Sequence, residues 1–128
     1  MVIGPEPTSI TDAYALIKVL STRSGRKEFD VLVNRATPAI DGKAAFQQLA
    51  QATDRFLNVS LKYLGSVSED DSVSQAVIKQ RPYLTLFPST KASLDIQKLA
   101  KKIDSDEVSR TPKGGLQFFF RALLEGNA

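Results

Sequence analysis

Few side chains in this sequence are suited to chemistry, and those that are follow short apolar runs. Glu6 lies between two prolines after the apolar pair Val2–Ile3, and Asn34 and Arg35 end the apolar run that begins at Phe29. Ligands of α/β proteins bind beyond the carboxyl ends of parallel strands, where such residues lie. The chain has no histidine and no cysteine, which removes the commonest general base and excludes thiolate chemistry and disulfides. Any site must therefore use other side chains.

The pattern of apolar residues predicts the elements that position these side chains. Strands are expected over residues 2–3, 29–34 and 57–64, and helices over residues 8–20, 43–53, 70–80 and 89–103. The central strand is apolar nearly throughout, which is typical of a parallel strand covered on both faces. Thr8 or Ser9 is expected to cap the first helix and Ser89 the last, after a loop over residues 84–90. Alternating strands and helices predict an α/β fold with a parallel sheet and helices on its faces.

The sheet predicted in this way is small and begins with a stub. Three strands leave at least one edge without a partner, and the first strand holds only two residues before Gly4 and Pro5. We therefore expect something to be missing before Met1, so that the chain is the product of a truncated or split gene or of a partial gene model.

The C-terminal region divides into two further segments. Residues 104–115 are polar, charged and rich in Pro and Gly, as in a linker. After them, an apolar stripe with helical spacing consists of Leu116, Phe119, Phe120, Leu123 and Leu124. The stripe fits either a helix packed in the core or an amphipathic helix on a membrane surface. The linker and the run of phenylalanines favour the membrane.

Composition and charge are those of an ordinary globular domain. Hydrophobic residues make up 42% and charged residues 24% of the chain, and the net charge is +3, so neither disorder nor a strongly basic protein is indicated. No apolar run approaches the ~20 residues that span a bilayer. No secretory signal is readable, which predicts a cytoplasmic location. Direct nucleic-acid binding is not expected, since no cluster of Lys and Arg is interleaved with aromatic residues.

Four stretches of the sequence together resemble one known family. They read GPEPTSITDAYALIKVL, FDVLVNRA, KYLGSV and AVIKQRPYLTLFPSTKASLDIQKLA. In order and spacing they resemble the C-terminal half of FlhG/FleN-type flagellar number regulators, in the MinD/ParA group of P-loop ATPases. The resemblance implies a partial P-loop NTPase-like, Rossmann-like domain over residues 1–103, a linker over 104–115 and a membrane-targeting helix over 116–128.

The resemblance also implies roles for the residues around the first strand. The loop with Pro5 and Glu6 is expected near the nucleotide, and Glu6 and Asp12 on the face where two ATP-bound subunits meet. The same residues also fit a plain structural role, in which Pro5 and Pro7 shape a turn and Asp12 stabilises the start of a helix.

By the same resemblance, Asn34 corresponds to the family's base-recognising asparagine, Arg35 follows it as in many relatives, and both are expected to bind the cofactor. The resemblance implies that the Asn34 amide binds the adenine edge, which both donates and accepts hydrogen bonds as an amide does. An asparagine at a strand end is also a common turn former. Residues 68–71 are expected to form the other wall of the adenine pocket, although Ser68 stands where relatives often have proline.

The family's cofactor is ATP with Mg²⁺, but the 128 residues contain no Gly-rich loop followed by Gly-Lys-Ser/Thr. The KGG stretch at 113–115 is expected to be a hinge. ATP hydrolysis is therefore not expected of this chain alone. No metal site is expected either.

Two functions remain open at this point. The first is a FlhG/FleN-like regulator of flagellar number and flagellar gene expression, peripheral at the inner membrane. By resemblance, its partners are a second copy or a missing N-terminal half, a flagellar transcription activator or flagellar GTPase, and the membrane. The alternative is a non-catalytic interaction module that docks on a separate protein or on the intact regulator.

Overall fold

The computed structural model describes residues 1–106 and has an α/β architecture. Its elements, in chain order, are β1 (Val2–Ile3), α1 (Pro7–Arg23), β2 (Glu28–Ala36), α2 (Gly42–Phe56), β3 (Ser60–Ser68), α3 (Asp71–Ile78) and α4 (Tyr83–Leu86). A further helix spans residues 91–106. The three described strands form a parallel sheet in the order β1-β2-β3, which confirms the predicted fold class.

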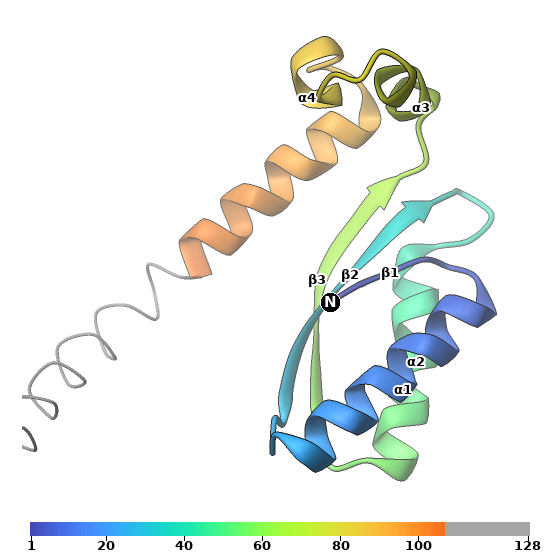
Figure 1. Cartoon of the computed structure of the whole chain (residues 1–128), viewed down its shortest axis with the longest axis vertical. Helices are drawn as coiled ribbons and strands as arrows, with labels where there is room; N and C mark the ends of the chain where they lie inside the picture. Colours follow the sequence, from blue (N-terminus) through green and yellow to red (C-terminus); the bar gives the residue numbers. More distant parts are fainter. Residues whose placement is uncertain (107–128) are drawn as a thin grey trace, which may run out of the picture.

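Helices α1 and α2 cover one face of the sheet (Figure 1). Alternate residues of β2, namely Phe29, Val31 and Val33, are buried on this face. The main hydrophobic cluster consists of Ile3, Ala13, Ile17, Phe29, Val31, Val33, Ala45 and Leu49. Its helical members recur at the spacing that the sequence predicts for α1 and α2.

Helix α2 approaches β3 closely at its first residue. A Cβ atom on Gly42 would lie 2.7 Å from the Cβ atom of Ser66. Asp41 caps this helix by accepting a hydrogen bond from the Lys43 backbone N–H at 3.1 Å. Glycine therefore lets the helix begin directly against the strand.

The helix over residues 91–106 lies on the opposite side of the sheet (Figure 1). A second, smaller cluster there contains the buried residues Val67, Ala92 and Leu99. The pairing of β2 with β3 shifts by one residue between Tyr63 and Gly65. Gly65 has a φ of +144°, and a Cβ atom on it would lie 2.8 Å from Leu99 Cδ2. The bulge thus allows the helix to contact the strand backbone.

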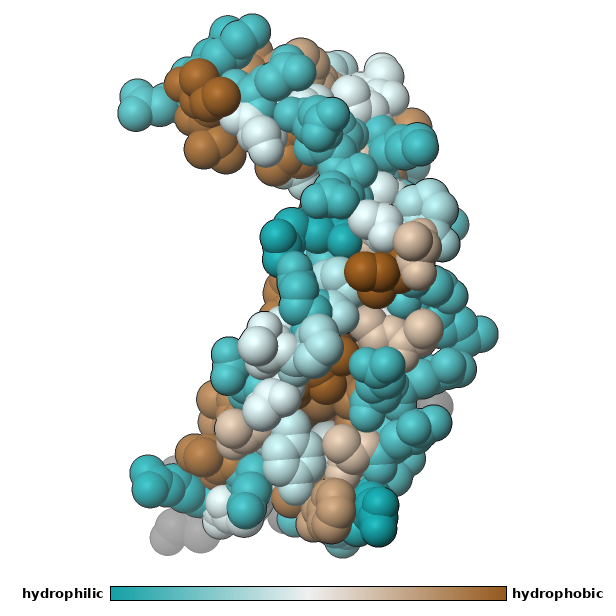
Figure 2. All heavy atoms as spheres, turned by 90° about the vertical axis from the view of Figure 1, so that its right-hand side faces the viewer, coloured by the Kyte–Doolittle hydropathy of each residue, from teal (hydrophilic) through white to brown (hydrophobic). Residues whose placement is uncertain are grey.

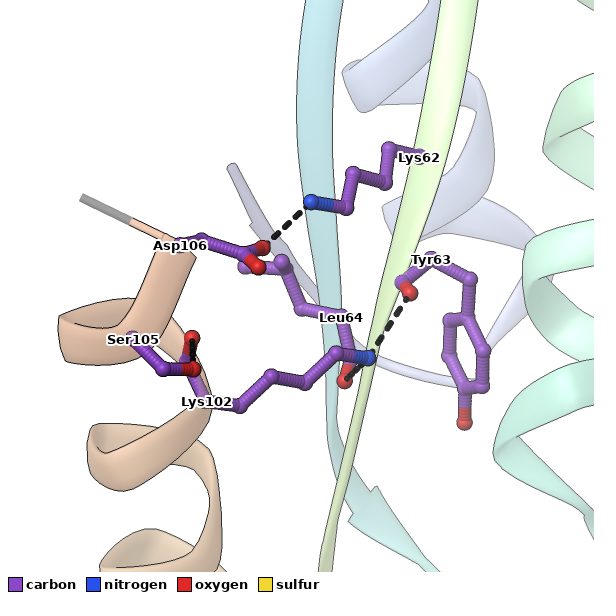
Figure 3. A network of polar contacts seen from close by, with 6 residues as sticks. All are labelled: Lys62, Tyr63, Leu64, Lys102, Ser105 and Asp106. Carbon is purple, nitrogen blue, oxygen red and sulfur yellow. Dashed lines mark hydrogen bonds and ion pairs between the residues drawn. The ribbon is translucent and has the colours of Figure 1, made fainter. Parts of the chain in front are cut away.

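Polar contacts hold the same helix against β3 (Figure 3). The Lys102 ammonium group donates to the Leu64 carbonyl at 2.8 Å and to the Tyr63 carbonyl at 3.5 Å. Lys62 pairs with Asp106 at 2.5 Å. The two Lys102 hydrogen bonds satisfy carbonyl groups at the bulge, which would otherwise need water.

The structure corrects several of the predicted boundaries. Strand β3 begins at residue 60, because Leu57 still closes α2 through its N–H on the Thr53 carbonyl at 2.7 Å. It continues past Gly65, where the sequence indicated an end, because the bulge absorbs the glycine. The helix over 91–106 continues through the first three residues of the predicted linker.

The predicted caps are also wrong at two helices. Helix α1 has Glu6 at its N-cap position without a side-chain cap, and the Ser9 hydroxyl accepts a hydrogen bond from the Gly4 N–H at 2.8 Å instead. Ser89 does not begin the last helix. At the start of that helix, the Asp70 carboxylate takes the role predicted for Ser89 and accepts a hydrogen bond from Ala92 N at 3.1 Å.

The expected loop over residues 84–90 is partly helical, since α4 spans Tyr83–Leu86. Pro82 occupies the N-cap position of this short helix, with φ −59°. Figure 2 shows that the molecule is hollowed on one side between the α1–α2 body and the lobe of α3 and α4.

Candidate functional site

The predicted site residues lie together at the carboxyl ends of β1 and β2. Four of them line one hollow of about 560 Å³, namely Glu6, Asp12, Asn34 and Arg35. Its other lining residues come from β1, from Gly4 and from the first turn of α1. Parallel strands that end side by side bring these segments together, although 22 residues separate Asp12 from Asn34 in the chain. Pro5 is not among the lining residues and lies in the turn before α1.

An ion pair between Arg35 and Glu6 connects the two strand ends. Arg35 is the extra residue where the pairing of β2 with β3 shifts, and its φ is +59°. This left-handed conformation is uncommon for arginine and costs about 1–3 kcal/mol. The guanidinium group donates to Glu6 Oε1. The two side chains are 58% and 43% exposed, so the pair itself adds little stability.

Gly4 leaves the space that this pair occupies. A Cβ atom at Gly4 would lie 2.1 Å from Glu6 Oε2 and 3.4 Å from the Arg35 guanidinium group. A side chain at this position would therefore move the Glu6 carboxylate. The sequence alone offered no signal for this, because the glycine looked like part of an ordinary turn.

The Asn34 side chain is exposed, and its carbonyl oxygen is already used once. It accepts a hydrogen bond from the Arg35 backbone N–H at 3.0 Å. An amide oxygen has a second lone pair, and the amide nitrogen has two protons to donate. The group can therefore still pair with a ligand edge that has one donor and one acceptor. Its bond to Arg35 N also fixes the direction of the side chain.

A second hollow, of about 550 Å³, lies at the carboxyl ends of β2 and β3. Three of the four residues from the predicted second wall line it, namely Ser68, Glu69 and Asp71, opposite Ala36 and the loop that follows. Asn34 is not among its lining residues. The predicted base-recognising asparagine and the predicted opposite wall therefore line two different hollows.

The second hollow includes residues that sequence reasoning did not single out. These are Asp41, Ser66 and Lys91. Lys91 begins the last helix, 21 residues after Asp70. Only the folding of α3 and α4 between them brings this lysine to the strand ends.

Asp70 orders the loop beside the second hollow. Its carboxylate accepts from Ser72 N at 2.9 Å and from Ala92 N at 3.1 Å, so one side chain caps α3 and the last helix. These hydrogen bonds, the Ser72 side chain first among them, lower the pKa of Asp70 from 3.8 to about 2. The charged carboxylate is the form that both helix starts require.

A larger hollow of about 670 Å³ lies at the other end of the sheet, around the start of β2. It contains none of the predicted site residues, and its lining mixes the cations Arg26 and Lys27 with the anions Glu28 and Asp30. Among residues 1–106, no group of three or more acidic side chains could hold a metal ion. No helix in this range is long and apolar enough to cross a membrane. The predicted stripe from Leu116 to Leu124 lies outside the described residues.

No protein-family model matches the sequence. Two curated proteins do match it over nearly its whole length. The antiactivator FleN of Pseudomonas aeruginosa is 46% identical over 125 residues, which are 98% of this chain and 45% of FleN. The resemblance to FlhG/FleN-type proteins is confirmed. The flagellum site-determining protein YlxH of Helicobacter pylori is 30% identical over 131 residues, covering 98% of this chain and 43% of YlxH.

The chain thus spans less than half the length of the FleN-type proteins that it matches. The matches fit a C-terminal part of such a protein. They extend through the segment beyond residue 106 as well, because 98% of the chain is aligned. Antiactivation and flagellum site determination are roles of FleN and YlxH themselves.

Proposed function

We propose that this chain is part of a FlhG/FleN-type regulator of flagellar number and flagellar gene expression. The observation that carries this proposal is the 46% identity to the antiactivator FleN across 98% of the chain. The proposed ligand is ATP, and the proposed partner is a flagellar transcription activator. A flagellar GTPase is a further proposed partner.

The first hollow supports a role for this chain in nucleotide binding and subunit contact. In our proposal, Asn34 binds the adenine edge, and the half-buried carboxylate of Glu6 and the exposed one of Asp12 face a second subunit. Arg35 lies between the base-binding surface and the subunit-contact surface of this proposal, because its backbone N–H binds the Asn34 side chain and its guanidinium group binds Glu6. A base bound at Asn34 would therefore affect the position of Glu6. The 128 residues contain no P-loop, and we propose that a P-loop-bearing polypeptide completes the phosphate side.

Calorimetry with ATP tests the nucleotide role. The chain is titrated alone and together with a P-loop-bearing N-terminal segment of a FleN-type protein, and binding is expected only for the combination. Asn34→Ala should weaken that binding about tenfold, the effect of one or two lost hydrogen bonds. Asn58→Ala is the matched control, since Asn58 is exposed and lies outside the hollow.

Two results would contradict this part of the proposal. One is ATP hydrolysis by the purified chain alone. The other is equal ATP affinity of the Asn34→Ala variant and its control. The regulatory role is tested by flagella per cell and flagellar transcript levels in a bacterium whose own FleN-type gene is replaced by a split version encoding both segments. Restored flagellar number is expected only when both segments are made.

We further propose that residues 116–128 attach the protein to the inner membrane surface. The apolar stripe of these residues supports this. A chain that ends at residue 115 should lose sedimentation with anionic liposomes. Unchanged sedimentation would assign the stripe to the protein core.

A second candidate function is a non-catalytic module that docks on another polypeptide. The specific observation in its favour is the edge of β1, which pairs only with β2 among the described strands and leaves Val2 66% exposed. This function predicts no ATP affinity in any combination, together with a partner that raises the unfolding temperature of the chain. The calorimetric titration therefore separates the two candidates.

A further inference from the structure

The end of α3 carries the two most exposed large apolar side chains among residues 1–106. Ile78 is 82% and Val77 is 70% exposed, and Leu84 in α4 is 37% exposed. We call residues 77–84 the α3–α4 ridge; all of them except Tyr83 are exposed. Figure 2 shows apolar side chains gathered at this end of the molecule. Apolar groups concentrated in one short exposed segment are typical of an interaction surface.

The backbone of the ridge is held in one conformation. Gln80 N donates to the Val77 carbonyl at 3.0 Å, and Arg81 N donates to the Ala76 carbonyl at 3.1 Å. This pair of bonds closes a helix end at which glycine is usual, yet Gln80 adopts the left-handed φ of +51°. Because the ridge is already ordered, a partner loses little binding energy to ordering it.

The charge of this region selects the chemistry of a partner. Between Asp71 and Asp95 the sequence contains no acidic side chain and three basic ones, Lys79, Arg81 and Lys91. The carboxylates of Asp70 and Asp95 act on Tyr83 of the ridge, but both already accept hydrogen bonds from backbone N–H groups, of Ser72 and Ala92 for Asp70 and of Ser68 for Asp95. Lys79 lies 5.8 Å from the centre of the Phe87 ring, so it stays beside the apolar surface. Apolar groups bordered by cations are complementary to an apolar stripe bordered by carboxylates.

A protein fits this surface better than a membrane does. Two cations on the ridge give only a small attraction to anionic lipid, whereas an arginine beside large apolar side chains is typical of the centre of a protein interface. We propose that the α3–α4 ridge binds an acidic amphipathic helix of another protein, with Val77, Ile78 and Leu84 on its apolar stripe. This site is separate from the proposed nucleotide function, because no ridge residue lines either hollow at the strand ends.

Fluorescence anisotropy with two labelled helical peptides tests the proposal on the full chain. Both peptides have leucines on one stripe, bordered by glutamates in the first and by lysines in the second. The glutamate peptide should bind at least about tenfold more tightly. Lys79→Glu with Arg81→Glu should reverse this preference.

A second pair of substitutions tests the apolar part of the ridge. Val77→Ser with Ile78→Ser should weaken binding of the glutamate peptide about tenfold or more. Because both side chains are at least 70% exposed, circular dichroism should remain unchanged. Leu16→Ser with Val19→Ser is the matched control, since these α1 residues are 50% and 45% exposed, and it should leave binding unchanged.

Three results would overturn the proposal. The first is equal affinity for the two peptides, or no affinity for either. The second is the same loss of binding in the α1 control variant. The third is sedimentation with phosphatidylglycerol vesicles that depends on Val77 and Ile78 without any binding of the glutamate peptide, which would make the ridge a lipid-binding surface.

Discussion

Replacing Gly65 by alanine tests how the last helix is attached to the sheet. The glycine has a φ of +144°, which only glycine adopts readily. Its added Cβ atom would also lie 2.8 Å from Leu99 Cδ2. Leu99 is 6% exposed and belongs to the smaller hydrophobic cluster, so it has little room to move.

The expected cost has two parts of similar size. The backbone conformation costs about 1–3 kcal/mol and the close contact about 1–3 kcal/mol. We therefore expect Gly65→Ala to lower the free energy of unfolding by about 4 kcal/mol. With a urea dependence of about 1.5 kcal/mol per molar, the midpoint of unfolding should fall by about 2–3 M.

Urea unfolding followed by circular dichroism measures this cost, and two variants separate its parts. Gly25→Ala is a control for the positive φ alone, because no atom lies within 4 Å of its added Cβ, and it should cost about 1 kcal/mol. In a Leu99→Ala background, Gly65→Ala should cost only the backbone part, about 2 kcal/mol. An undiminished cost in that background would refute the contact between the bulge and the helix.

Three further predictions concern the loops and the sheet contacts. For Asp70→Asn, the loss of stability seen in urea midpoints at pH 7 should shrink below about pH 4 and disappear as the pH falls through about 2, because the depressed pKa of Asp70 makes its stabilisation present above 3.8 and lost below the folded-state value. A pH-independent difference would contradict this. Gly42→Ala should lower the free energy of unfolding by about 1–3 kcal/mol, since its Cβ would lie 2.7 Å from that of Ser66, and Ser66→Gly should restore part of it. Gly4→Ala should displace the Glu6 carboxylate yet change the unfolding free energy by less than about 1 kcal/mol, because the ion pair is exposed; a larger loss in urea titrations would show that the pair stabilises the fold.

The sheet and its two covering helices could be predicted from the sequence because local patterns determine them. The run around Val31 and Val33 is apolar and rich in valine, and the observed β2 is a parallel strand with both residues fully buried. The end of β3 could not be predicted in this way. Gly65 indicated a turn, but a bulge that depends on the distant Leu99 places it inside the strand.

The sequence also failed to predict a helix cap where one side chain binds two segments that are distant in the chain. Ser89 precedes the last helix and has the right side chain for a cap, yet the carboxylate that binds Ala92 N comes from Asp70, 22 residues away. The candidate site was partly accessible from sequence, because Glu6 follows β1 and Asn34 lies near the carboxyl end of β2. The Arg35–Glu6 pair was not, since it depends on the positive φ of Arg35 at a shift in strand pairing.

Because the two hydrophobic clusters are separate and unequal in size, one part of the described chain should unfold locally before the other. The larger cluster is enclosed by the sheet with α1 and α2, whereas three buried residues hold the smaller one. Local opening needs less free energy where fewer apolar groups are buried. Within residues 1–106, we therefore expect a protease at low concentration to cut first between residues 69 and 106, leaving a fragment of α1, α2 and the three strands that resists digestion longer.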